Sequence, residues 1–206
     1  MSVNLQKGQK VDLTKGNAGL SRVMVGLGWD EAERTAGGFF KSLFSTESQE
    51  EIDCDAIAFM LDGQGKLVDR RDIIFFNNLR HPSGSVVHQG DNLTGAGEGD
   101  DEQILIDLAN VPERYERIVI MVSIYKADER RQHFGKIKNA FIRLVDNSNG
   151  KELCIYNLSE NYDGMTSMVF GELYRKNGEW KFSAVGQPLK MWRISDLASR
   201  FGYIMR

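Results

Sequence analysis

The stretch that decides the fold is "MVFGELYRKNGEWKFSAVG", residues 168–186. On each side of Asn177-Gly178, apolar and polar residues alternate with the period of two that is typical of a half-buried strand. An Asn-Gly pair between two such runs predicts a two-residue hairpin, because both central positions of a type I′ turn need a positive φ. We therefore expect two antiparallel strands joined by a tight turn.

Short segments rich in β-branched and aromatic residues recur along the rest of the chain, separated by turn sequences such as "DGQG", "HPSG" and "DNSNG". The expected strands are residues 22–29, 54–61, 72–78, 84–90, 103–108, 117–125, 139–146, 151–158, 168–175 and 179–186. Two short helices are expected, around residues 127–134 and 195–201. About ten strands without long crossover helices favour an all-β antiparallel β-sandwich over a parallel α/β fold.

Length and composition bound the possible classes of protein. A chain of 206 residues can bury one good core, so we expect a single domain over residues 1–206. A formal net charge of -3 excludes a generally basic nucleic-acid binder. Cys54 and Cys154 lack the spacing of a zinc or thiol site, and no stretch approaches the roughly 18 apolar residues of a membrane span. These features predict a soluble cytoplasmic protein.

One segment, residues 31–51, departs from the strand pattern. It is rich in Gly, Ser and Glu around an apolar group formed by Phe39, Phe40, Leu43 and Phe44. We interpret it as a long, mobile insertion whose aromatic side chains tuck onto the sandwich. The alternative is a docking flap for a partner or a membrane surface, since the spacing would place these side chains on one face of a short helix.

The loop before "QILIDL" concentrates negative charge on a flexible backbone. Residues 91–102 contain three glycines, no basic residue and five carboxylates, namely Asp91, Glu98, Asp100, Asp101 and Glu102. Hard divalent cations such as Ca²⁺ take six to eight oxygen ligands from carboxylates, amides and backbone carbonyls. The EF-hand pattern fails, because Leu93 and Gly95 occupy ligand positions and a strand follows. A phosphate cradle also fails, because it would need a basic residue.

A second group of oxygen-bearing side chains lies at other strand ends. Asp53 and Asp55 alternate at the start of a strand, so a period of two puts both carboxylates on one face, about 6.5–7 Å apart. Asn78 ends another strand, and Asp30 follows "GLGW". Together these residues predict a metal-binding cup at one end of the sandwich. His88 precedes the acidic loop, but nitrogen is a poor calcium ligand, so we interpret it as a structural or a surface residue.

Several motifs resemble those of the tellurium-resistance TerD family of bacterial stress proteins. They are "VGLGWD", "IDCDA", "FFNNL", "GSVVHQGDNLTGAGEGDDEQILIDL" and "GELYRKNGEWKFSAVGQ", and the resemblance is collinear over nearly the whole chain. The aromatic insertion and "IDCDA" are most similar to the TerX branch. The chain departs from the family at Cys54, which stands between the two aspartates where an apolar residue is usual, and at "PLKMW" after "AVGQ".

The resemblance implies a calcium-binding β-sandwich with no established catalytic activity, holding one or two Ca²⁺ ions. Residue by residue, it implies the metal ligands Asp53, Asp55, Asn78, Asp91, Asn92, Asp100, Asp101 and Glu102. It also implies a stress-response role, including tellurite resistance, through protein complexes at the inner face of the membrane. We expect a calcium-dependent binding or scaffold module. The alternative is a divalent-metal-dependent enzyme acting on a phosphate or oxyanion substrate.

Overall fold

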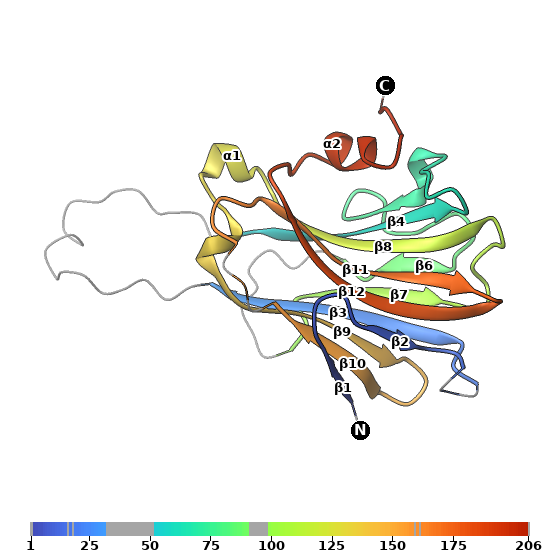
Figure 1. Ribbon diagram of the computed structural model, residues 1–206. Helices are drawn as coiled ribbons and strands as arrows, with labels where there is room; N and C mark the ends of the chain where they lie inside the picture. The colour runs from blue at the N-terminus through green and yellow to red at the C-terminus, as the bar shows by residue number, and fades with distance from the viewer. Residues whose placement is uncertain are drawn as a thin grey trace, which may run out of the picture.

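Two six-stranded sheets stack face to face in the computed structural model, which describes residues 2–15, 17, 19–31, 52–90, 99–158, 160 and 162–205 (Figure 1). The first, here called the β3 sheet, has the order β1-β10-β9-β3-β7-β6. Its strands are β1 (Val3–Leu5), β10 (Lys151–Asn157), β9 (Ile137–Asp146), β3 (Arg22–Glu31), β7 (Glu102–Asp107) and β6 (Val86–His88). The second, the β8 sheet, has the order β2-β12-β11-β8-β4-β5. Its strands are β2 (Lys10–Asp12), β12 (Glu179–Leu189), β11 (Ser167–Lys176), β8 (Tyr115–Ile124), β4 (Cys54–Asp62) and β5 (Ile73–Ile74). The predicted antiparallel β-sandwich is confirmed.

The hairpin that decides the fold has the predicted geometry. Strands β11 and β12 pair antiparallel, and the last pair before the turn is Lys176 with Glu179. Asn177 and Gly178 have φ angles of 55° and 77°. Both central residues therefore adopt the positive φ that a type I′ turn requires, and the prediction from the Asn-Gly pair is confirmed.

The structure differs from the predicted elements mainly at the edges of the sheets. The three-residue strands β1 and β2 were not predicted, and β1 pairs parallel with β10. The strand expected at 72–78 is reduced to β5, because the 3-10 helix η1 (Arg70–Asp72) precedes it and a turn closed by Phe75 and Asn78 follows. A second 3-10 helix, η2 (Phe134–Lys136), also forms.

The two predicted helices form but are shorter than expected. Helix α1 (Ala127–Arg130) ends early because Arg131 adopts a left-handed conformation, with a φ of 52°. Helix α2 (Ile194–Ser199) is followed by a turn. Figure 1 shows α2 lying over the outer side of the layer that contains β4 and β8.

The core lies between the sheets, and a second apolar layer lies under α2. Val25 and Leu27 of β3 pack in the same buried cluster as Ala58 and Met60 of β4. The alternate residues of β4, including Phe59, belong to a second cluster completed by Leu197 and Ala198 of α2. Strand β4 is therefore buried on both faces, which explains its almost continuous apolar sequence.

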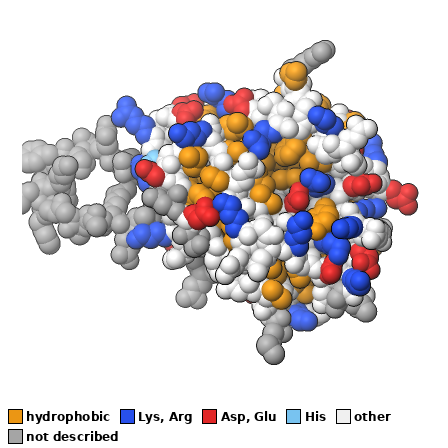
Figure 2. Space-filling model, in the orientation of Figure 1, with side chains coloured by type: hydrophobic (Ala, Val, Ile, Leu, Met, Phe, Trp, Pro, Cys, Tyr) orange, Lys and Arg blue, Asp and Glu red, His pale blue; other side chains and the backbone are white. Residues whose placement is uncertain are grey.

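The surface carries charges of both signs. Figure 2 shows Lys and Arg side chains interspersed with Asp and Glu over the visible face, around smaller apolar areas. This mixture agrees with the small net charge of -3. Within the described ranges, no helix combines the length and apolar character needed to cross a membrane.

Candidate metal centre at the acidic end of the sandwich

The acidic residues gather where β3 ends and where β4 and β7 begin. Leu27 of β3 pairs with Glu102 of β7, and the Asp101 N–H donates to the Leu27 carbonyl oxygen at 2.7 Å. In the other sheet, the Tyr125 N–H donates to the Asp53 carbonyl oxygen at 2.8 Å, which fixes the chain just before β4. These backbone bonds place two acidic segments, distant in the sequence, at the same end of the sandwich.

Four of the predicted ligands are near enough to Cys54 to act on its thiol electrostatically. Burial of the thiol raises the pKa of Cys54 well above its ordinary value, and the carboxylates of Asp55, Asp53, Asp101 and Glu102 raise it further, in that order. Neighbouring negative charge disfavours a thiolate only when it is close. Asp53 and Asp55 of one sheet and Asp101 and Glu102 of the other therefore all lie within electrostatic range of this thiol.

Asp101 lies where negative charge is crowded. Its Oδ2 accepts a hydrogen bond of 2.8 Å from the Trp29 N–H. Burial nevertheless raises the pKa of Asp101, and the carboxylates of Asp30 and Asp100 add to the rise. A raised pKa under these conditions means that a nearby cation would stabilise the ionised carboxylate.

Glu102 lies in the interior beside a histidine. Its side chain is 1% exposed, and its Oε2 lies 2.8 Å from Nε2 of the equally buried His88. The Gly90 N–H donates to Nδ1 of the same ring at 3.1 Å. Because Nδ1 accepts that bond, the proton of the neutral ring is on Nε2, the nitrogen that lies nearer the carboxylate. His88 thus lies against Glu102 in the interior, which agrees with a structural residue and not with a surface one.

Asp100 points to the outer face of the β3 sheet, where it contacts Arg143 of β9. Oδ1 accepts from Nε at 2.7 Å and Oδ2 accepts from Nη2 at 3.0 Å. Oδ2 also accepts from Nε2 of Gln103 at 3.2 Å. The carboxylate reaches across β3 because Gly26 has no side chain there, and an added Cβ would overlap the carboxylate. The Asp100 carboxylate is therefore paired with Arg143 on the outer face, while it stays close enough to Asp101 to raise the pKa of that carboxyl.

The remaining predicted ligands divide into two groups. Asn78 is turned toward its own segment, where its Nδ2 donates to the Ile73 carbonyl oxygen at 2.6 Å. Asp91 and Asn92 lie outside the described residues, as does the 32–51 part of the expected insertion. Asp53 Oδ2 lies 3.6 Å from Nη1 of Arg130, so a basic residue adjoins the acidic group.

The donor chemistry fits a hard cation, although the described residues do not complete a site. Carboxylate oxygens predominate at this end, and they are the ligands that Ca²⁺ prefers. Within the described ranges, no group of three or more His, Cys, Asp or Glu side chains is arranged to hold a metal ion on its own. A complete coordination shell would therefore require oxygen atoms from beyond these side chains.

Sequence reasoning did not find the cationic partners of this region. Arg130 reaches Asp53 from helix α1, and Arg143 reaches Asp100 from β9, the neighbour of β3 in the sheet. Nothing in the local pattern of either arginine signals such a partner. The contact of His88 with Glu102 did have a signal in the sequence, because His88 lies two residues before the acidic loop.

Comparison with known proteins gives a consistent assignment. The model of the TerD domain matches residues 1–201. The chain is 51% identical to stress response protein SCP2 of Bacillus subtilis over 201 residues, covering 98% of this chain and 100% of that protein. It is 48% identical to tellurium resistance protein TerD of Serratia marcescens over 187 residues, covering 91% of each.

Two further similarities agree with these matches. Identity to tellurium resistance protein TerX of Serratia marcescens is 46% over 202 residues, covering 91% of this chain and 93% of that protein. The crystal structure of a homologue of telluride resistance protein (TerD) from Streptomyces coelicolor A3(2) superimposes with a TM-score of 0.64 at 20% identity. It covers 91% of this chain and 100% of the other, and supports the fold alone. The chain therefore belongs to the TerD family, which includes tellurium resistance and stress response proteins.

Proposed function

We propose that this protein is a calcium-dependent binding module of the bacterial stress response, whose acidic end holds one or two Ca²⁺ ions. The observation that carries the proposal is that the backbone places Asp101 and Glu102, where β7 begins, and Asp53 and Asp55, where β4 begins, at the acidic end of the sandwich. Bound calcium would neutralise carboxylates that otherwise repel one another. The raised pKa of Asp101, caused first by burial and then by the carboxylates of Asp30 and Asp100, supports this need for a cation.

The described carboxylates would form one wall of the site, and Asp91 and Asn92 would supply further oxygen ligands. Asp100 and Asn78 complete the predicted set, but their hydrogen bonds to Arg143 and to the Ile73 carbonyl would have to be exchanged for metal contacts. We therefore expect Asp53 and Asp101 to contribute more to calcium affinity than Asp100 does.

Calcium titration by isothermal calorimetry tests the proposal. The double variant Asp53→Asn with Asp101→Asn keeps the size of both side chains and removes two charges. We expect saturable binding by the wild type and a loss of at least tenfold in the variant, about 1.4 kcal/mol. Asp196→Asn is the matched control, because Asp196 is an exposed aspartate on α2, over the outer side of the other sheet. Equal affinities in all three proteins, or no binding at millimolar calcium, would refute the assignment.

Thermal unfolding gives an independent reading of the same binding. A ligand at 100 times its Kd stabilises the folded state by about 2.7 kcal/mol. For a chain of this size, 1 kcal/mol corresponds to about 2–4 °C in Tm, so calcium should raise Tm by roughly 5–10 °C. We propose that the bound ion presents a surface for protein partners in a complex at the inner face of the membrane. Pull-downs with calcium and with EDTA should then recover different partners.

A further inference from the structure

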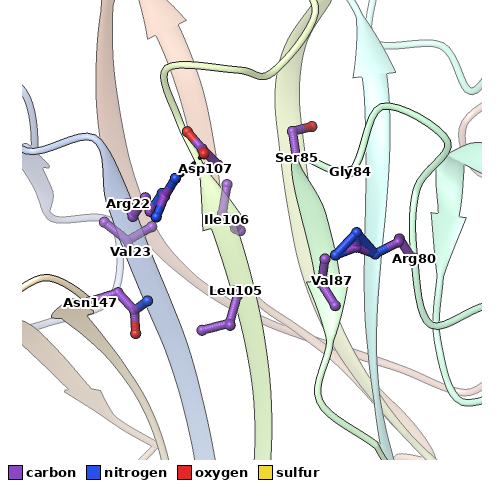
Figure 3. Close-up of a pocket in the computed structure, with 10 residues that line it drawn as sticks. All are labelled: Arg22, Val23, Arg80, Gly84, Ser85, Val87, Leu105, Ile106, Asp107 and Asn147. Atoms are coloured by element: carbon purple, nitrogen blue, oxygen red, sulfur yellow. Dashed lines mark hydrogen bonds and ion pairs between the residues drawn. The ribbon is translucent and has the colours of Figure 1, made fainter.

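A pocket lies on the outer face of the β3 sheet, toward the end opposite the acidic group. It is formed over β7 between β3 and β6, as Figure 3 shows, and has a volume of about 250 Å³. Its floor includes Leu105 of β7 and Val87 of β6, which are paired in register and point away from the core. Pockets for drug-sized ligands begin at roughly 300 Å³, so this one suits a smaller molecule.

Two arginines stand on opposite sides of this pocket. Figure 3 shows Arg22 and Arg80 across β7 from each other. Arg22 Nε donates to Asp107 Oδ2 at 3.1 Å, and the Asn110 amide donates to the same oxygen at 3.0 Å. Burial alone would raise the pKa of Asp107. The hydrogen bonds from Asn110 and Arg22 outweigh burial and hold this pKa below its ordinary value. The lining side chains therefore carry a net positive charge, in a protein that is acidic as a whole.

Arg80 is the cation that the fold leaves available. Its guanidinium forms no ion pair with any side chain in the described part of the chain, and it lies beside Gly84, with Nη1 3.6 Å from the position that a Cβ would occupy there. Its backbone is held by an antiparallel bridge to Val87. An arginine fork on a fixed backbone is suited to two-point contact with the oxygen atoms of an anion.

The pocket wall is stiffened by a buried chain of hydrogen bonds. Ser85 lines the pocket, is 2% exposed, and has its Oγ 2.7 Å from Oγ of Ser83. That second hydroxyl lies 2.6 Å from His81 Nδ1, and His81 Nε2 lies 3.3 Å from Asp72 Oδ1. The Ser83 N–H also donates to Nδ1 at 3.1 Å, so the hydroxyl proton of Ser83 points to the ring. The position of Ser85 is therefore fixed before any ligand arrives.

We propose that this pocket binds a small oxyanion, with Arg80 as the principal contact. The terminal nitrogens of Arg22 and the Asn147 amide supply further donors, since neither bonds to another side chain among the described residues. Leu105 and Val87 exclude water from one side, which strengthens charge-assisted hydrogen bonds. Phosphate and tellurite share this chemistry, because both present negatively charged oxygen atoms to a guanidinium fork. The proposal does not depend on calcium.

Two-dimensional amide NMR of the full chain in EDTA tests the proposal, with sodium phosphate and sodium tellurite as separate probes. Sodium chloride at equal ionic strength corrects for screening. We expect saturable shifts at Val87, Leu105 and Asn147, and at least tenfold weaker binding in Arg80→Gln. Arg131→Gln is the matched control, because Arg131 is a surface arginine with no ion pair among the described residues.

The outcomes separate clearly. Saturation by either probe, lost in Arg80→Gln and kept in Arg131→Gln, supports the pocket and identifies which oxyanion occupies it. Shifts that fail to saturate with both probes overturn the proposal. So does binding that survives in Arg80→Gln, or that falls equally in both variants, provided that the variants give dispersed amide spectra that show they are folded.

Discussion

The contact of Asp100 with Gly26 predicts a strong coupling between two residues that are distant in the sequence. A methyl group added at Gly26 would overlap the Asp100 carboxylate, whose side chain is fully buried and is held by two hydrogen bonds from Arg143. The carboxylate must therefore leave Arg143 when Gly26→Ala is made. A hydrogen bond to a charged group contributes about 1.5–3 kcal/mol. Because Arg143 is 31% exposed, we take the lower figure for each bond, which gives about 3 kcal/mol.

A double-mutant cycle isolates this coupling. In the Asp100→Ala background the carboxylate is gone, so Gly26→Ala should cost less than about 0.5 kcal/mol, and the interaction energy should approach about 3 kcal/mol. In wild type, Gly26→Ala should lower Tm by roughly 6–12 °C, at about 2–4 °C per kcal/mol. Urea unfolding in EDTA, followed by tryptophan fluorescence, measures all four proteins without a contribution from calcium.

Gly28→Ala provides the matched control, because its methyl would meet the Phe141 ring and the Gly99 carbonyl instead. Its cost should be the same with and without the Asp100 carboxylate. An interaction energy below about 0.5 kcal/mol for Gly26 and Asp100 would refute the reasoning. The same would follow from an equal coupling of Gly28 with Asp100, since the effect would then not be local to Gly26.

Two other predictions concern buried groups. Cys54 and Cys154 are fully buried, so a thiol reagent at pH 8 should label neither in the folded protein and both after unfolding; rapid labelling of the native chain would contradict the burial. Burial and the hydrogen bond to Asp72 raise the pKa of Tyr115 to about 12, above the value near 10 of an unfolded chain. The contribution of this group to the free energy of unfolding is complete below about pH 10 and is lost as pH rises toward 12. Tyr115→Phe should therefore make the free energy of unfolding depend less on pH between these values. An unchanged slope in the variant would show that other groups cause the loss.

The fold was largely predictable because most strands have a strong local signal. The alternation around Asn177-Gly178 specified both the strands and the turn between them. The edge strands β1 and β2 have only three residues each, which is too short for a period of two to be recognised. At 72–78 the apolar run was real, but the hydrogen bonds of Asp69 and Asp72 formed a helical turn that took up the first residue.

The gathering of acidic side chains at one end of the sandwich was predictable, whereas their individual contacts were not. A period of two was enough to group Asp53 with Asp55, and their proximity to Asp101 and Glu102 follows the expected meeting of strand ends. The pairing of Asp100 with Arg143 could not be foreseen, because it depends on the strand order β9-β3-β7 and on the absence of a side chain at Gly26. Sequence alone gives neither the order of the strands nor the contact that Asp100, beside β7, makes with Arg143 of β9 across β3.

The two proposed sites lie near opposite ends of β3, and this separation decides how they can interact. Arg22 lines the pocket, whereas the Trp29 N–H bonds to Asp101 seven residues later. At about 3.3 Å per residue these positions are roughly 23 Å apart. The Debye length is about 10 Å at 0.1 M ionic strength, so charge alone should carry little coupling between a cation at one end and an anion at the other. Any linkage between calcium and oxyanion binding would therefore have to pass through a displacement of β3 itself. Titration of calcium with and without the oxyanion, and of the oxyanion with and without calcium, would then show both affinities changed by the same factor.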